Sequence, residues 1–205
     1  MGCIKKPLLA AALGVLVGLM PMAPGMQERP AYGYSEADLK RLIEAGDCVE
    51  CDLHAANLSN LNLSGVNLER ANLTGANLSG TKLIGTRLDG ANLGGANLHG
   101  ASLEEAFLVN AKVSGANLAG ANLRRTNLQD ADLSSANLSG ANLSGAYMSN
   151  TKLTGANLHN ANLSGNDLSS TFLSGANVYG TDFRNTSGLT DEQIAEYKKR
   201  GAKLN

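Results

Sequence analysis

The sequence predicts an all-β solenoid, a rod in which short extended segments wind around a narrow apolar column. Leucine or a substitute recurs at every fifth residue from Leu53 to Phe183, which gives 27 consecutive pentads. Aromatic residues make up only 4% of the 205 residues and tryptophan is absent, so the rings that fill most globular cores are missing. The 24 glycines suit a chain that turns often.

Each pentad places two residues on the inside of the rod. Two positions before the central leucine, the residue is alanine in seventeen pentads and threonine in six. Residues two apart in an extended segment share a face, so this small residue and the leucine both point inward. The Ser-Gly that commonly follows predicts a tight turn, and glycine in fifteen pentads suits the positive φ of a type II turn. Alternating segments and corners then produce stacked coils.

The unit Ala-Asn-Leu-Ser-Gly resembles the repeat of the pentapeptide-repeat family, Ala-(Asn/Asp)-Leu-x-x, across residues 51–185. The resemblance implies a right-handed quadrilateral β-helix with four pentads per coil, in which residues twenty apart stack. It also raises one functional alternative, because some members resemble B-DNA in width and charge and inhibit topoisomerases.

The first segment, residues 1–33, is predicted to be an export signal. Lys5 and Lys6 form a positive start, and residues 8–20 form an apolar stretch. Small residues allow a cut after Gly33, and cuts after Gly25 or Ala31 are the alternatives. Thirteen apolar residues are few for a membrane span, but an uncleaved N-terminal anchor is the alternative. The expected location is therefore the periplasm, a lumen or the extracellular space.

Residues 34–50 are expected to form an N-terminal capping helix and lead-in. Ser35 is a suitable N-cap, and Gly46 ends the helical pattern. A cap is needed because an open coil would expose leucine side chains and unpaired strand edges.

A second capping helix is expected in residues 186–205. Thr190 and Gln193 form a capping box, and Leu189 and Ile194 fit a hydrophobic staple. This helix has few apolar residues, so it is expected to lie across the end of the rod or to close it.

Cys48 and Cys51 are both expected to point inward and to meet around the first corner. Cys48 lies five residues before Leu53, and Cys51 takes the small inward position of the next pentad. A disulfide is the leading hypothesis for an exported chain, and two free buried thiols are the alternative. Thiol-disulfide redox chemistry is a minor alternative, since no thioredoxin-like βαβ pattern surrounds the pair.

With four pentads per coil, the residue just before each leucine can be assigned to one of four outward faces. One of them, the asparagine face, carries asparagine without exception: Asn57, Asn77, Asn97, Asn117, Asn137, Asn157 and Asn177. Stacked amides can hydrogen-bond as a ladder, which we favour over an array that binds a ligand.

The face opposite, the aromatic face, is the candidate partner surface. Its outward residues are Asn67, Arg87, Phe107, Asn127, Tyr147 and Asp167. We single out Arg87, Phe107, Val109 and Tyr147, because exposed aromatic side chains beside polar groups are typical interface anchors. Tolerated surface variation is the alternative interpretation.

Two further details remain open in the sequence. Glu104 and Glu105 lie twenty residues before Arg124 and Arg125, which predicts exposed ion pairs between coils. Asn166 occupies an inward position, where it either bonds to a carbonyl of the coil or marks a local distortion.

The composition favours a protein that is not an enzyme and has no cofactor. The three histidines point outward and are not grouped, and no serine has a matched histidine and acid. The repeats carry nine acidic and eight basic residues, which argues against nucleic-acid binding and against a DNA mimic. The sequence predicts an exported structural or protein-binding scaffold, with a DNA-mimicking gyrase inhibitor as the alternative. Its expected partner is another protein, and only an uncleaved N-terminal segment would hold it to a membrane.

Overall fold

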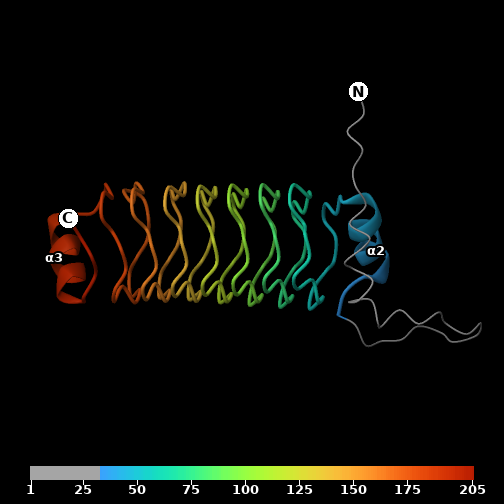
Figure 1. Cartoon of the computed structure of the whole chain (residues 1–205), viewed down its shortest axis with the longest axis horizontal. Helices are drawn as coiled ribbons and strands as arrows, with labels where there is room; N and C mark the ends of the chain where they lie inside the picture. Colours follow the sequence, from blue (N-terminus) through green and yellow to red (C-terminus); the bar gives the residue numbers. More distant parts are fainter. Residues whose placement is uncertain (1–32) are drawn as a thin grey trace, which may run out of the picture.

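The computed structural model describes residues 33–205, which form a rod of stacked coils with a helix at each end (Figure 1). The coils are held by parallel bridges between residues twenty apart, such as Asn77 with Asn97. Twenty residues are four pentads, so the quadrilateral coil expected from the resemblance is confirmed. The first bridge joins Asp47 to Asn67, so the coil register begins slightly before residue 51. Of the predicted export segment, all but Gly33 lies outside the described residues.

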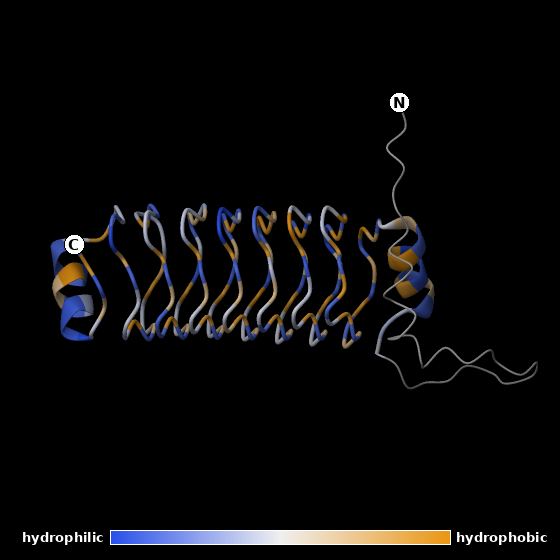
Figure 2. Ribbon diagram, viewed as in Figure 1, coloured by the Kyte–Doolittle hydropathy of each residue, from blue (hydrophilic) through white to orange (hydrophobic). Residues whose placement is uncertain are grey.

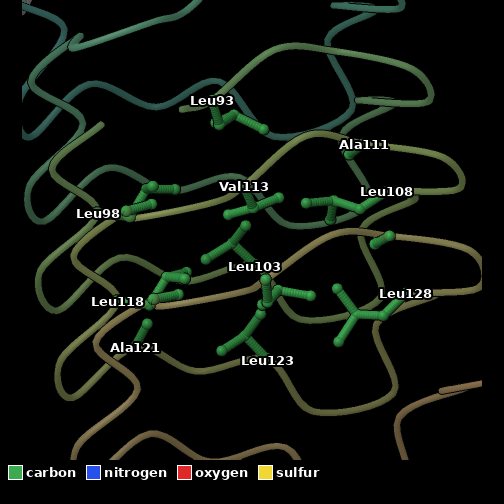
Figure 3. Packing of buried hydrophobic residues seen from close by; sticks show 14 of the residues in the cluster. Leu93, Leu98, Leu103, Leu108, Ala111, Val113, Leu118, Ala121, Leu123 and Leu128 are labelled. Carbon is green, nitrogen blue, oxygen red and sulfur yellow. The ribbon is translucent and has the colours of Figure 1, made fainter. Parts of the chain in front are cut away.

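The core is a column of central side chains that are almost completely removed from solvent. Leu93, Leu98, Leu103 and Leu108 supply one coil, and Val113 begins the next (Figure 3). Along each coil, hydrophobic and hydrophilic residues alternate, as inward and outward positions require (Figure 2). All six threonines at the small inward position donate their hydroxyl to a carbonyl 23 residues earlier. The hydroxyl groups of these inward threonines are thereby satisfied.

The corners adopt a positive φ whether or not they contain glycine. Eleven of the twelve repeat corners that lack glycine still have φ between 54° and 58°, Arg70 and Ser135 among them. The left-handed conformation costs such residues about 1 kcal/mol or more. The ladder compensates for this cost, since the Arg70 N–H donates to the Asp89 carbonyl of the next coil at 2.9 Å. Glycine therefore eases the corner but does not determine it.

Helix α2, Glu36–Ala45, covers the N-terminal end of the column. Its N-cap Ser35 accepts a hydrogen bond from the Asp38 N–H, and Gly46 ends it with φ of 62°, as the sequence predicts. Leu42 is completely buried against the first coil. The backbone of Asp52 fastens the helix, because its N–H donates to the Asp38 carboxylate and its carbonyl accepts from the Ser35 N–H.

Helix α3, Asp191–Lys199, covers the opposite end (Figure 1). The capping box of Thr190 and Gln193 is present. Ile194, however, is 38% exposed, and Tyr197 is the buried residue of the helix. Its ring stacks on Phe183, the last side chain of the column, with ring centroids 5.5 Å apart.

The C-terminal tail completes the last coil. After α3 the chain returns to the rod, and Lys203 forms a parallel bridge with Asp182. The Phe183 N–H donates to the Lys203 carbonyl at 2.8 Å, and the Gly180 N–H donates to Gly201 at 2.9 Å. The tail thus pairs strand edges that the final coil would otherwise leave open.

Candidate interaction surface

The aromatic face presents two large exposed rings on one straight ladder. Consecutive bridges join Arg87 to Phe107, Phe107 to Asn127 and Asn127 to Tyr147. Phe107 is 45% exposed and Tyr147 is 62% exposed. The two rings therefore lie on the same face with a single asparagine position between them. Removing these two rings from water is energetically favourable, so the pair is suited to contact with another molecule.

Arg87 and Val109 have more limited roles on this face. The Arg87 guanidinium forms an ion pair with Glu69 one coil below, so its charge is already neutralised. The Val109 N–H donates a hydrogen bond to the Asp89 carboxylate at 3.0 Å. Val109 is only partly exposed and lies in the corner that follows Phe107. Phe107 and Tyr147 are thus the most accessible apolar side chains of the aromatic face.

Other exposed apolar side chains are distributed over the remaining faces. Phe172, 53% exposed, forms a bridge with Lys152 on the face next to the aromatic one. Tyr179 lies in a corner of the asparagine face and stacks on His159 with ring centroids 5.6 Å apart. Ile84 is exposed on a third face. These scattered side chains provide a matched comparison for the aromatic face.

The asparagine face forms a continuous amide ladder. Every asparagine from Asn77 to Asn177 donates its side-chain N–H to the Oδ1 of the asparagine twenty residues earlier, at 3.1 to 3.4 Å. Each Oδ1 also accepts a backbone N–H two residues on, as Asn117 does from Ala119 at 3.2 Å. These amides satisfy one another, so the structure supports the structural interpretation of the face.

Several charged side chains form ion pairs between or within coils. Arg70 contacts Glu50 at 2.8 Å, and Arg184 contacts Asp182 at 2.6 Å. Arg125 contacts both Glu104 and Glu105, at 2.9 and 2.8 Å. The predicted ion pairs are therefore formed by one arginine, whereas Arg124 takes no part in them.

Four aspartates have pKa values below the usual 3.8 because they accept hydrogen bonds. The principal donors are the side chains of His54 for Asp52, Ser134 for Asp132, Ser169 for Asp167 and Arg184 for Asp182. Each carboxylate binds its proton less readily in the folded chain than in the unfolded chain.

This difference predicts a solenoid that loses stability in acid. A lowered folded-state pKa contributes stability that is fully present above 3.8 and is lost as the pH falls through the folded-state value. We expect the urea concentration at the unfolding midpoint to fall as the pH is lowered from about 5 to about 2, a range that brackets the ordinary aspartate pKa. Asp182→Asn should reduce this pH dependence. A midpoint that rises on acidification would contradict the prediction.

Cys48 and Cys51 are joined by a disulfide across the first corner of the solenoid. Both are buried, and their Cα atoms lie 5.2 Å apart. The Cys48 Sγ lies 3.2 Å from the Asp38 carbonyl oxygen, so the bridge lies directly beneath α2. The disulfide therefore closes the corner to which the N-terminal helix is attached.

Reduction of this disulfide should destabilise the chain only modestly. The bridge closes a loop of sequence separation 3, and so short a loop contributes about 2 kcal/mol through the entropy of the unfolded state. Reductant should lower the free energy of unfolding in urea by this amount. Cys48→Ala with Cys51→Ala should abolish the response to reductant, and thiol titration without reductant should find neither cysteine. Titratable thiols at Cys48 and Cys51 would contradict the bridge.

Residues 33–205 contain no group of three or more histidine, cysteine, aspartate or glutamate side chains that could hold a metal ion. In the same part of the chain, no helix is long and apolar enough to cross a membrane. His54 instead contacts the Asp52 carboxylate at 2.8 Å. His159 contacts the Asn160 amide at 3.0 Å.

The repeat region matches the family model for pentapeptide repeats, with eight copies in segments 51–90, 81–118, 113–150 and 146–185. The chain belongs to the pentapeptide-repeat family. Family membership accounts for the regular ladder and the leucine column. Proteins of this family generally act through structure and interaction rather than catalysis.

Several solved pentapeptide-repeat structures are similar to this chain. HetL, involved in heterocyst differentiation regulation in the cyanobacterium Nostoc sp. strain PCC 7120, is 34% identical over 66% of this chain and 73% of its own, with a TM-score of 0.40. A pentapeptide-repeat protein from the Arabidopsis thaliana thylakoid lumen is 26% identical over 78% and 80%, with a TM-score of 0.27. QnrB1, a plasmid-mediated fluoroquinolone resistance protein, is 20% identical over 70% and 84%, with a TM-score of 0.43. A comparison with curated protein sequences finds no match.

Proposed function

We propose that this pentapeptide-repeat protein is an exported, non-enzymatic scaffold that binds another protein through its aromatic face. The observation that carries the proposal is the exposure of two aromatic rings, Phe107 and Tyr147, on one ladder of the same face. Rings on a rigid β-helix lose little conformational entropy on binding, so they are efficient anchors.

The charge distribution supports a protein partner over nucleic acid. Glu50, Glu69 and Asp182 each contact an arginine, so these acidic groups form no unbroken negative surface. A mimic of DNA needs uncompensated negative charge along its length. The gyrase-inhibitor alternative therefore receives less support than a protein-binding scaffold.

Export is supported by the N-terminal pattern and by the cysteine pair. The apolar stretch 8–20 after two lysines is typical of a secretory signal. A disulfide between Cys48 and Cys51 suits an oxidising compartment. Fractionation of the source cells tests this part: recovery with periplasmic, lumenal or secreted markers supports export, and recovery with cytoplasmic markers contradicts it.

The partner surface is tested by affinity capture with two matched double variants. Phe107→Ala with Tyr147→Ala removes the rings of the aromatic face, and Phe172→Ala with Tyr179→Ala removes two exposed rings on other faces. We expect the first pair to weaken binding of the captured partner about tenfold or more and the second to leave it unchanged. Equal retention by the two variants, measured by titration calorimetry with the purified partner, would reject the aromatic face.

A further inference from the structure

The ladder between coils is interrupted at one place on the aromatic face. Tyr147 forms a bridge with Asn127 below it, and Asp167 forms one with Ser187 above it. The bridge that the twenty-residue register requires between Tyr147 and Asp167 is not formed. We call this interruption the seam.

Backbone hydrogen bonds are missing along the whole seam. One coil earlier, the N–H groups of Leu128 and Asp130 donate to carbonyls of the next coil at 2.8 and 2.9 Å. At the seam, the equivalent N–H groups of Met148 and Asn150 make no such bond, and neither does the N–H of Asp167. The seam is therefore the weakest contact between neighbouring coils in this part of the rod.

Asn166 explains why the coils separate here. It occupies an inward position at 2% exposure, and its side-chain N–H donates to the Leu143 carbonyl at 3.0 Å. Threonine makes the same bond elsewhere with a shorter side chain, as Thr126 does to Leu103 at 2.8 Å. The longer asparagine contacts the Met148 sulfur at 3.4 Å, and its own Oδ1 has no partner. Both proposals from the sequence therefore hold, since Asn166 bonds to a carbonyl and also marks a distortion.

The segment beside the seam remains attached on its other sides. Gly165 and Leu168 donate their N–H groups to the coil above at 3.1 and 2.9 Å. Beyond the corner, Thr171 donates its hydroxyl to the Met148 carbonyl at 3.2 Å, and Phe172 forms its bridge with Lys152. The loosened part is thus limited to residues 164–170.

We infer that residues 164–170 form a strap that opens locally and gives solvent intermittent access to the column at Met148. Opening the strap breaks no backbone ladder bond to the coil below, because those bonds are not made. Local opening occurs most readily where a protein has the fewest backbone hydrogen bonds. The strap lies on the aromatic face next to Tyr147, but this inference does not depend on partner binding.

Hydrogen exchange of single amides tests the strap. The Met148, Asn150 and Asp167 amides should exchange about tenfold or more faster than those of Leu128 and Asp130. Asn166→Thr keeps a donor to the Leu143 carbonyl with the side chain used elsewhere in the column, so it should slow exchange at the seam to the rate of the neighbouring coil. Ala161→Thr is the matched control, because it adds threonine where the ladder is intact, and it should leave the seam amides unchanged. Equal exchange rates in the natural chain would overturn the strap.

Oxidation of Met148 gives a second readout that does not depend on Asn166→Thr folding. Hydrogen peroxide transfers one oxygen atom to the thioether sulfur and leaves water, which yields methionine sulfoxide. Leu128→Met places a second buried sulfur at the equivalent site one coil earlier. Met148 should be oxidised about tenfold faster than the sulfur introduced at position 128. Equal oxidation rates at the two sites would contradict selective opening at the seam.

Discussion

Phe183→Ala is expected to lower the free energy of unfolding by about 4 kcal/mol, the largest effect of a single truncation in this chain. Phe183 is the last side chain of the column and supports the ring of Tyr197 from helix α3. A surface hollow of about 210 Å³, lined in part by Phe183, Leu189 and Ile194, already lies beside it. Loss of the ring would join new empty space to this hollow and leave α3 without its main contact.

Urea unfolding of three variants tests this expectation. Phe183→Leu restores the side chain used at most other column positions and should cost less than half as much as alanine. Phe172→Ala removes an exposed ring and should change stability by less than about 0.5 kcal/mol. A Phe183→Ala variant as stable as Phe172→Ala would show that the C-terminal cap contributes little to folding.

Leu103→Ala is expected to cost about 3 kcal/mol. Leu103 is fully buried in the middle of the column, surrounded by Leu98, Leu108 and Leu123 (Figure 3). Its neighbours are fixed by ladder bonds on both sides, so they cannot move inward to fill the space. The variant is therefore expected to bear the full free-energy cost of the cavity that the missing leucine leaves.

Leu103→Met is the matched control, since it keeps the volume and should cost less than about 1.5 kcal/mol. The transition should be followed by circular dichroism and by tyrosine fluorescence, because coils of a solenoid can unfold in stages. The contrary result is that the two probes report the same transition while the free energies of unfolding of Leu103→Ala and Leu103→Met agree within error. That result would show that the column is less tightly packed than its burial indicates.

The sequence predicts the regular part of this fold because each pentad repeats one physical choice. The inward position of Phe183 and the outward positions of Phe107 and Tyr147 follow from counting by fives. Ile194 and Tyr197 could not be assigned in this way. The side of α3 that faces the column depends on how the tail returns to pair Lys203 with Asp182, and that pairing has no repeat signature.

The candidate site shows the same division. Because residues twenty apart stack, Phe107 and Tyr147 lie on one ladder, as predicted. The pairing of Arg87 with Glu69 depends on side-chain rotamers, which the pattern does not encode. At Asn166 the sequence signalled an irregularity, but the missing bonds of Met148 and Asn150 emerge only when neighbouring coils are compared.

The twenty-residue register also determines how the rod can change in length. Successive pentads occupy successive faces, so inserting one pentad after Gly115 would turn every later residue by one face and separate Tyr147 from Phe107. An insertion of four pentads would keep both rings on one face and only move them farther apart. Growth by whole coils therefore preserves a binding surface, whereas growth by single repeats creates a new one.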